Sequence, residues 1–324
     1  MLNALTASTH RLQRIDLAAG ERLPDDAVWI DLLEPIVEEE QLVERTFKID
    51  VPTREEMREI ETSNRLYEEN GTLYMTMTVA AKLDTDRPES AAVTFILTQG
   101  RLVTNRYVDT KPFRNFASYC ERNGGSLSSG AAVLTGLIEA SVQRIADVLE
   151  RVGSDLDAMS GTIFNSVSGR APASGDLRDL MERIGFSGEL DSKARESLVS
   201  LGRLLMFVQQ SQLPELSEEL RGRLRSSNRD VLALSDYATF LAGKVTFLLE
   251  ATLGLINIEQ NNIIKIFSVA AVMFLPPTFI ASVYGMNFHH MPELDWHVGY
   301  PFALLVMILS AVVPYWWFKR KGWL

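Results

Sequence analysis

The sequence predicts an α+β domain, with a mixed and largely antiparallel sheet flanked by helices, followed by a very long helix and a two-helix transmembrane hairpin. Three observations support this fold class. Short apolar runs separated by turn residues fill residues 1 to about 110. Helical periodicity begins at Lys111 and continues toward the C-terminus. Two apolar runs, Ile263–Tyr284 and Tyr300–Phe318, lie near the end of the chain with a short polar segment between them.

The first predicted elements are a strand and two helix starts. Ala27–Leu32 is a short apolar run, which is typical of a buried strand. Pro35 precedes an acidic helical stretch, Ile36–Phe47. Thr53 and Glu56 fit a capping box, with Thr53 as the N-cap and Glu56 as the third helical residue. These signals place helices beside the predicted sheet.

Two hairpins follow these elements. Asn70-Gly71 is a strong hairpin turn signal because both residues tolerate the left-handed backbone that a type I′ turn requires. Gln99-Gly100 occupies the equivalent place in a second pair of apolar runs. The paired strands are Arg65–Glu69 with Thr72–Lys82, and Ala92–Thr98 with Arg101–Val108. Consecutive hairpins make the predicted sheet mostly antiparallel.

From Lys111 the apolar residues recur at spacings of three and four, as on one face of a helix. Those that carry the pattern are Val133, Leu134, Leu137, Ile138, Val142, Ile145, Val148, Leu149 and Val152. Ser166–Gly175 is small and polar, which predicts a loop, and Leu177–Gln212 predicts a further helix.

One long helix is predicted to join the domain to the apolar runs. Ser226–Asp230 offers N-cap side chains, and no proline occurs between Val231 and Leu275. The apolar pattern continues without a break into Ile263–Tyr284. We therefore expect a single helix from about Arg229 to about Tyr284, polar at its start and membrane-embedded at its end.

The two apolar runs have the length of membrane spans. Ile263–Tyr284 carries one charge, Lys265, and its length suits the roughly 30 Å of a bilayer core. Positive residues lie before the first span and in the basic tail after the second, so the positive-inside rule predicts that both termini are cytoplasmic. The predicted segments are residues 1–228 (domain), 229–262 (cytoplasmic stalk), 263–284 (first span), 285–299 (extracytoplasmic loop), 300–318 (second span) and 319–324 (tail).

The charge balance narrows the function classes. The chain has 32 basic and 42 acidic residues, and residues 1–262 alone carry 28 and 40, a net charge of −12. This sign argues against nucleic-acid binding and is compatible with cation binding or with solubility alone. A single cysteine, Cys120, permits no internal disulfide and suits a reducing cytosol. We find no nucleotide-binding Gly-rich loop and no catalytic triad, so we expect neither a nucleotide partner nor an enzyme.

Small and polar residues follow one another along one face of the first span. They recur every three or four positions. The members of this stripe are Asn261, Ile264, Ser268, Ala271, Leu275, Thr278 and Ser282. Such a face either allows close helix packing or lines a wet path. A lone hairpin cannot enclose a pore, so the second alternative requires several copies of the chain around an axis.

Asn287 directly follows the first span and would lie at the mouth of such a pore. Its amide oxygen is a neutral acceptor, and Mg²⁺ gives up its water reluctantly. A ring of amide oxygens can hold the hydrated ion through its water without trapping it. Glu293 and Asp295 in the loop would raise the local cation concentration. Inward movement of a divalent cation along a 100 mV potential releases about 4.6 kcal/mol, which favours passive influx.

The residues around this loop resemble the CorA family of magnesium transporters. Tyr284-Gly285-Met286-Asn287, followed by Met291-Pro292-Glu293-Leu294, matches the family signature, and the intervening Phe288 fits as well. Further similar stretches are Val28–Pro35, Val93–Leu102, Asn257–Asn261, Ile263–Phe267, Phe274–Thr278 and Phe318–Leu324. The resemblance therefore covers nearly the whole chain and is strongest after Gly254.

The resemblance implies a homopentameric funnel in the bacterial inner membrane, with the first spans lining the pore and membrane lipids around the second spans. It implies that Gly285, Met286 and Asn287 select hydrated Mg²⁺, and that Co²⁺ and Ni²⁺ are also transported. Further pore rings are implied at Asn261, Phe267, Leu275 and Thr278, with Phe267 as a hydrophobic constriction.

The resemblance also implies gating by intracellular Mg²⁺ between acidic cytoplasmic domains. Glu250 on the stalk is the candidate for one regulatory ligand, and a surface carboxylate without that role is the alternative. The loop departs from the usual family pattern at His289, His290 and Asp295. Together with His297 these residues could form a transition-metal site, although exposed loop histidines are the simpler interpretation.

Two other functions remain open at this point. A zinc transporter of the same superfamily would also carry the Gly-Met-Asn triplet, but the Met291–Leu294 run favours magnesium. A membrane-anchored scaffold that transports nothing would need neither Asn287 nor a polar stripe.

Overall fold

The computed structural model describes residues 1–6, 12–16, 20–59, 61–123, 129–166, 174–211, 216–287, 289, 291–292 and 295–322. The chain divides into two compact units. Unit 1 comprises Met1–Arg170 and Asp179–Leu249, and unit 2 comprises Ala171–Arg178 and Glu250–Leu324. The division therefore falls inside a long helix, after Leu249.

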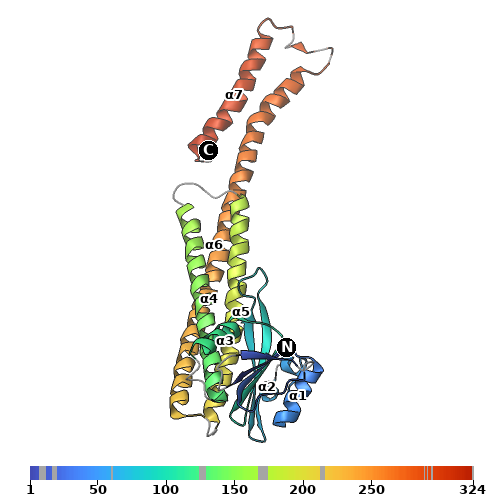
Figure 1. Ribbon diagram of the computed structural model, residues 1–324. Coiled ribbons are helices and arrows are strands. Elements are labelled where there is room, and N and C mark those ends of the chain that lie inside the picture. The colour runs from blue at the N-terminus through green and yellow to red at the C-terminus, as the bar shows by residue number, and fades with distance from the viewer. Residues whose placement is uncertain are drawn as a thin grey trace. The chain divides into compact units, whose positions relative to one another are not determined.

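Unit 1 contains a seven-stranded sheet in the order β2-β1-β3-β7-β6-β5-β4 (Figure 1). The strands are β1 Leu2–Thr6, β2 Leu12–Ile15, β3 Ala27–Leu33, β4 Leu66–Glu69, β5 Thr72–Ala81, β6 Glu89–Thr98 and β7 Arg101–Arg106. Every neighbouring pair is antiparallel except β3 and β7, which run parallel with Ile30 opposite Val103. The predicted mixed and largely antiparallel sheet is confirmed, and β1 and β2 are additions that the sequence analysis did not include.

Both predicted hairpin turns are present and have the expected backbone. Asn70 and Gly71 have φ angles of 51° and 75°, and Gln99 and Gly100 have 49° and 75°. These left-handed values are those of a type I′ turn, whose twist matches that of the flanking strands. The turns fix the register of β4 with β5 and of β6 with β7.

The helices of the described chain are α1 Val37–Phe47, α2 Thr62–Arg65, α3 Lys111–Asn123, α4 Gly130–Ser166, α5 Ser174–Gln210, α6 Glu218–Tyr284 and α7 Gly299–Arg320, with a 3₁₀ turn η2 at Glu56–Arg58. The Thr53–Glu56 capping box has its two reciprocal bonds, from the Thr53 N–H to Glu56 Oε2 at 2.8 Å and from the Glu56 N–H to Thr53 Oγ1 at 3.3 Å. This capping box is followed by the short η2 turn and not by an α-helix.

Helix α6 begins earlier than the sequence analysis predicted. Ser226–Asp230 lies inside the helix and does not cap it. The hydroxyl of Ser217 instead accepts a bond from the Leu220 N–H at 3.3 Å. Glu218 and Glu219 then occupy the first turn, where the helix dipole favours negative charge. Ser226 therefore does not act as an N-cap, because α6 has already begun at Glu218.

The two faces of the sheet have separate cores. Ile30 and Leu32 of β3 pack with Val43 and Phe47 of α1 on one face. On the other face, the fully buried Trp29 lies 6.2 Å from the Phe113 ring and 5.8 Å from the Phe116 ring, both in α3. The sheet is thus flanked by helices on both faces, as the alternation of side chains along β3 requires.

Helix α5 contacts the edge of β5 beyond the end of the short strand β4. β4 pairs only with Thr72–Met75, so the next residues of β5 lack a partner strand on that side. The Thr78 N–H donates to Ser200 Oγ at 2.8 Å, and Ser197 Oγ donates to the Thr78 carbonyl at 3.1 Å. Two serines of α5 therefore satisfy the backbone of Thr78 at this edge.

Candidate ion pathway

Unit 2 contains two helical segments with the length and apolar composition of membrane spans. They are the end of α6, up to Tyr284, and α7, Gly299–Arg320. Large apolar side chains are exposed along both, among them Phe267, Phe274 and Phe279, each 71% exposed. In an aqueous monomer this surface would be unfavourable, so lipid or further protein must cover it.

Helix α7 covers one face of the end of α6 (Figure 1). Val269 of α6 and Phe318 of α7 are buried, and the Lys265 ammonium donates to the Gly322 carbonyl at 3.4 Å. The less exposed positions of α6 in this region follow the spacing of a single helix face. They are Lys265, Val269, Ala270, Met273, Pro276, Pro277, Ile280 and Tyr284.

The predicted stripe lies on the opposite face. Ala271 of the stripe is two residues after Val269, and a two-residue step is about 200° around a helix. Phe267 is not a stripe member, but it is two residues before Val269 and lies on the same side as Ala271. Thr278, nine residues on, is also about 180° from Val269. Every member of the stripe is exposed: Asn261, Ile264, Ser268, Ala271, Leu275, Thr278 and Ser282. The small and polar face is therefore not used for packing against α7.

Backbone and hydroxyl groups add polar atoms along this helix. Pro276 and Pro277 lack N–H groups, so the carbonyls of Val272 and Met273 lose their usual helical donors while α6 continues through both prolines. The Thr278 hydroxyl donates to the Phe274 carbonyl at 2.7 Å, and its oxygen can still accept a bond. The end of α6 thus offers oxygen acceptors within an apolar segment.

Gly285, Met286 and Asn287 directly follow α6, and all three are exposed. The Gly285 N–H donates to the Ala281 carbonyl at 2.9 Å, and the Met286 N–H donates to the Val283 carbonyl at 3.3 Å. Gly285 does not use the left-handed backbone. An added Cβ would lie 3.1 Å from the Ala281 oxygen, a tight contact that requires a shift of a few tenths of an ångström.

The remaining predicted residues are dispersed. Asp295 and His297 are exposed in the loop before α7, His289 is also exposed, and Glu250 is exposed on α6. Glu293, His290 and Phe288 lie outside the described residues. Among the residues that the structure describes, no three His, Cys, Asp or Glu side chains are grouped closely enough to hold a metal ion.

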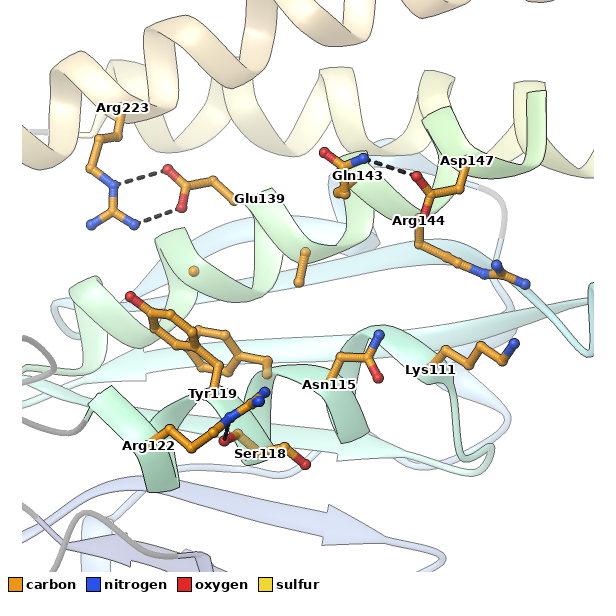
Figure 2. A pocket seen from close by; sticks show the side chains of 13 residues that line it. Lys111, Asn115, Ser118, Tyr119, Arg122, Glu139, Gln143, Arg144, Asp147 and Arg223 are labelled. Atoms are coloured by element: carbon orange, nitrogen blue, oxygen red, sulfur yellow. Dashed lines mark hydrogen bonds and ion pairs between the residues drawn. The ribbon is translucent and has the colours of Figure 1, made fainter. Parts of the chain in front are cut away.

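A second candidate site, in unit 1, was not identified from the sequence. It is a cavity of about 960 Å³ between α3 and α4, with Arg223 of α6 at one end (Figure 2). Its polar side chains come from separate helices, and no motif in the sequence connects them. The two carboxylates that line it, Glu139 and Asp147, are accompanied by four basic side chains.

Comparison with known proteins identifies the family. The model of the family "CorA-like Mg²⁺ transporter protein" matches residues 24–320. The chain is 37% identical over 325 residues to the magnesium transport protein CorA of Pasteurella multocida, and 35% identical to that of Salmonella typhimurium. Both alignments cover 100% of each chain.

Solved structures share the fold. The CorA magnesium transporter of Methanocaldococcus jannaschii superposes with a TM-score of 0.76 at 19% identity, covering 100% of this chain and 99% of that one. The full-length CmaX protein gives a TM-score of 0.67 at 16% identity, covering 99% and 97%. The order of a mixed-sheet domain, a long helix and a C-terminal apolar helix agrees with that fold.

The family consists of ion transporters, so this chain is not an enzyme. The resemblance stated from Gly285–Asn287 and the following loop is confirmed over the whole length. The chain belongs to the CorA family of magnesium transport proteins.

Proposed function

We propose that this chain forms a homopentameric channel through which hydrated Mg²⁺ enters the cytoplasm passively. The observation that carries the proposal is the exposed stripe on α6, opposite the face that α7 covers. Polar groups that face lipid are costly, whereas several copies around an axis would turn them toward a shared wet path. The α7 helices would then form the outer ring, toward the lipid.

The selective step is proposed to occur at Gly285, Met286 and Asn287. Five Asn287 amides around the axis would bind Mg²⁺ through its retained water. Neutral acceptors hold a divalent ion less tightly than carboxylates, which allows it to leave. Asp295 and Glu293 would concentrate cations near this entrance. Co²⁺ and Ni²⁺ are proposed as further substrates.

The location follows from the charge distribution near the spans. Lys319, Arg320 and Lys321 follow α7, and Lys265 lies near the start of the apolar part of α6. By the positive-inside rule, this excess of positive charge supports cytoplasmic termini, and we propose a location in the bacterial inner membrane. The membrane potential then supplies about 4.6 kcal/mol per Mg²⁺ at 100 mV, and no nucleotide is required.

Intracellular Mg²⁺ is proposed to close the pore. The net charge of −12 on residues 1–262 would make cytoplasmic domains of neighbouring copies repel each other. Mg²⁺ bound between them, with Glu250 as one ligand, would reduce the repulsion and favour the closed form. Phe267, 71% exposed on the stripe side of α6, would form the hydrophobic constriction.

The proposal is tested by ion uptake into liposomes that hold the purified full-length protein. Asn287→Ala should abolish Mg²⁺ uptake while leaving the oligomer intact by size-exclusion chromatography. Ser310→Ala is the matched control, because Ser310 lies on α7 and its hydroxyl donates to the Met307 carbonyl at 2.7 Å. This control should retain uptake.

Other outcomes would support the two alternative functions. Zn²⁺ uptake driven by a proton gradient, without Mg²⁺ uptake, would identify a zinc transporter of the same fold. If the wild-type oligomer is intact but takes up neither ion, the result would support a membrane-anchored scaffold that transports nothing. Wild-type Mg²⁺ flux through Asn287→Ala would remove Asn287 from the selective step.

A further inference from the structure

The cavity in unit 1 is large enough for a small molecule. Its volume of about 960 Å³ lies at the upper end of the usual range for ligand pockets. Its lining residues are Lys111, Asn115, Phe116, Ser118, Tyr119 and Arg122 of α3, Gly136, Glu139, Ala140, Gln143, Arg144 and Asp147 of α4, and Arg223 of α6. The long axis of the cavity follows α3 and α4, as Figure 2 shows.

Two small residues of α4 shape this side of the cavity. Gly136 lies against the Phe116 ring, and a Cβ added there would be only 2.2 Å from Phe116 Cε2. Ala140 follows one turn later on the same face and has no side chain beyond Cβ. The Phe116 ring therefore fills the space beside Gly136, whereas the cavity lies beside Ala140, where a larger side chain would fill it.

The lining is cationic although the chain is acidic. Lys111, Arg122, Arg144 and Arg223 line the cavity with only two carboxylates, in a protein of net charge −10. Arg122 donates from Nε to the Ser118 carbonyl at 3.1 Å, and within the described residues it forms no ion pair. Its remaining guanidinium N–H groups can therefore bind an anion.

Lys111 and Arg144 already bind an oxyanion at one end. The Lys111 ammonium lies 2.7 Å from Asp84 Oδ2, and Arg144 Nη2 lies 2.8 Å from each Asp84 oxygen. Arg151 Nη1 also donates to Asp84, at 3.0 Å. These hydrogen bonds keep the pKa of Asp84 well below its usual range. Asp147, three residues after Arg144 on α4, also lines this end. Lys111, Arg144 and Arg151 still outnumber the two carboxylates Asp84 and Asp147 by one, and they keep unused N–H donors for a further oxyanion.

The opposite end is built differently. Arg223 donates to Glu139 through Nε at 2.9 Å and Nη2 at 2.6 Å, so these two charges balance each other. The ring of Tyr119, 45% exposed, lies next to them and offers a flat apolar face. Arg122 lies below Tyr119 in Figure 2, beside Ser118. Lys111 and Arg122 are eleven residues apart, about 16 Å along α3, so a compact anion cannot contact both ends.

We propose that this cavity binds an elongated polyanion of nucleotide size, with a phosphate chain at Lys111 and Arg144 and a planar group between Tyr119 and Arg122. Asn115 and Gln143 lie between the two ends and supply amide donors and acceptors. The site uses side chains of two helices instead of a Gly-rich phosphate loop, which explains why no nucleotide motif is present in the sequence. The proposal does not depend on the transport mechanism.

Titration calorimetry on the full-length protein in detergent tests the proposal, with adenosine triphosphate as the probe and with EDTA present to remove divalent metal. We expect saturable binding that weakens as the salt concentration rises. Inorganic tripolyphosphate should bind about tenfold more weakly, because it reaches only the Lys111 end and loses the contacts at Tyr119 and Arg122. Equal affinities for the two probes would overturn the two-ended site.

Arg122→Ala is the principal variant, because Arg122 is exposed and its loss does not threaten folding. It should lower the affinity for adenosine triphosphate about tenfold and leave that for tripolyphosphate unchanged. Ala140→Leu should abolish both. Arg225→Ala is the matched control, since Arg225 is an exposed arginine of α6 that pairs with Glu218 at 3.2 Å and does not line the cavity. Absence of binding at millimolar probe, or equal losses in Arg122→Ala and Arg225→Ala, would refute the proposal.

Discussion

Asp31 and Arg106 form a buried, two-bonded ion pair between the parallel strands β3 and β7. Arg106 donates from Nε to Asp31 Oδ1 at 2.9 Å and from Nη2 to Oδ2 at 2.8 Å, with side chains 6% and 1% exposed. The Thr104 hydroxyl donates to Asp31 Oδ1 at 2.7 Å, and the guanidinium lies 4.5 Å from the centre of the Phe113 ring. The pair therefore links the sheet to α3.

Asp31→Asn should lower the free energy of unfolding of unit 1 by about 3–5 kcal/mol, because it leaves a buried guanidinium without its charge partner. Fluorescence of the buried Trp29, followed during urea unfolding of the detergent-solubilised protein, measures the change. Asp109→Asn is the control. Asp109 pairs with the same Arg106 at 3.1 Å but is 40% exposed, so we expect a loss of at most about 1 kcal/mol. Equal losses would contradict the assignment of stability to the buried pair.

Asp191 of α5 should make unit 1 less stable as the pH rises. The residue is 3% exposed, and its Oδ1 has no hydrogen-bond partner among the described residues. Burial raises the pKa of Asp191 from 3.8 to about 6, although Arg195 opposes the shift. The folded state therefore binds the proton more tightly than the unfolded state. The contribution of Asp191 to stability is greatest below pH 4 and falls by about 2–3 kcal/mol as the pH rises through 6.

Urea midpoints measured between pH 4 and pH 7 test this dependence. Asp191→Asn cannot ionise, so its unfolding free energy should lack this part of the pH dependence. Asp155→Asn, which changes an exposed carboxylate of α4, should retain it. If the unfolding free energies of the wild type and of Asp191→Asn change with pH at the same slope, Asp191 is not the source of the pH dependence.

Asn261 and Asn262 provide a test of which face of α6 conducts. Asn261 belongs to the exposed stripe. Asn262 is also exposed, but it precedes Val269 by seven residues, close to two helical turns, and so shares the side of α6 that carries Val269. Asn261→Ala should reduce Mg²⁺ uptake into liposomes several-fold because it removes a polar ring from the path. Asn262→Ala should leave uptake near the wild-type rate. The reverse pattern would place the pathway on the other face.

Phe267→Ala should weaken closure of the pore. A smaller side chain widens the hydrophobic constriction, so water remains in it and ions leak through. The measurement is Mg²⁺ flux out of liposomes loaded with high Mg²⁺, where the wild type should be closed. Phe302→Ala on α7 is the control and should close normally. Normal closure of Phe267→Ala would exclude Phe267 as the gate.

Local signals in the sequence predicted most of the elements. Asn70-Gly71 and Gln99-Gly100 determine their turns through residues adjacent in the chain, so both hairpins could be predicted. The start of α6 could not, because Ser226–Asp230 and Ser217 are equally plausible caps by residue type. Packing within unit 1 decides that Ser217 precedes the first turn of α6 and that Ser226–Asp230 lies inside the helix.

The stripe on α6 could be predicted for the same reason as the hairpins, since helical spacing alone places Ala271 and Thr278 on one face. The face that α7 covers could not, because it depends on contacts between Val269 and a helix that follows a loop. The cavity in unit 1 was missed entirely. Arg122 and Arg144 are separated in sequence and line the same cavity only because α3 and α4 pack together.

The two serines of α5 that bond to the backbone of Thr78 have a consequence for the protein in a crowded cell. An unpaired strand edge is a template onto which another chain can add, and repeated addition leads to aggregates. Ser197 and Ser200 occupy the donor and acceptor that such a chain would need. Neighbouring copies would be held at high local concentration in a membrane. The serine bonds to Thr78 make it less favourable for a strand of another copy to pair with this edge, and so help to prevent polymerisation through the sheets.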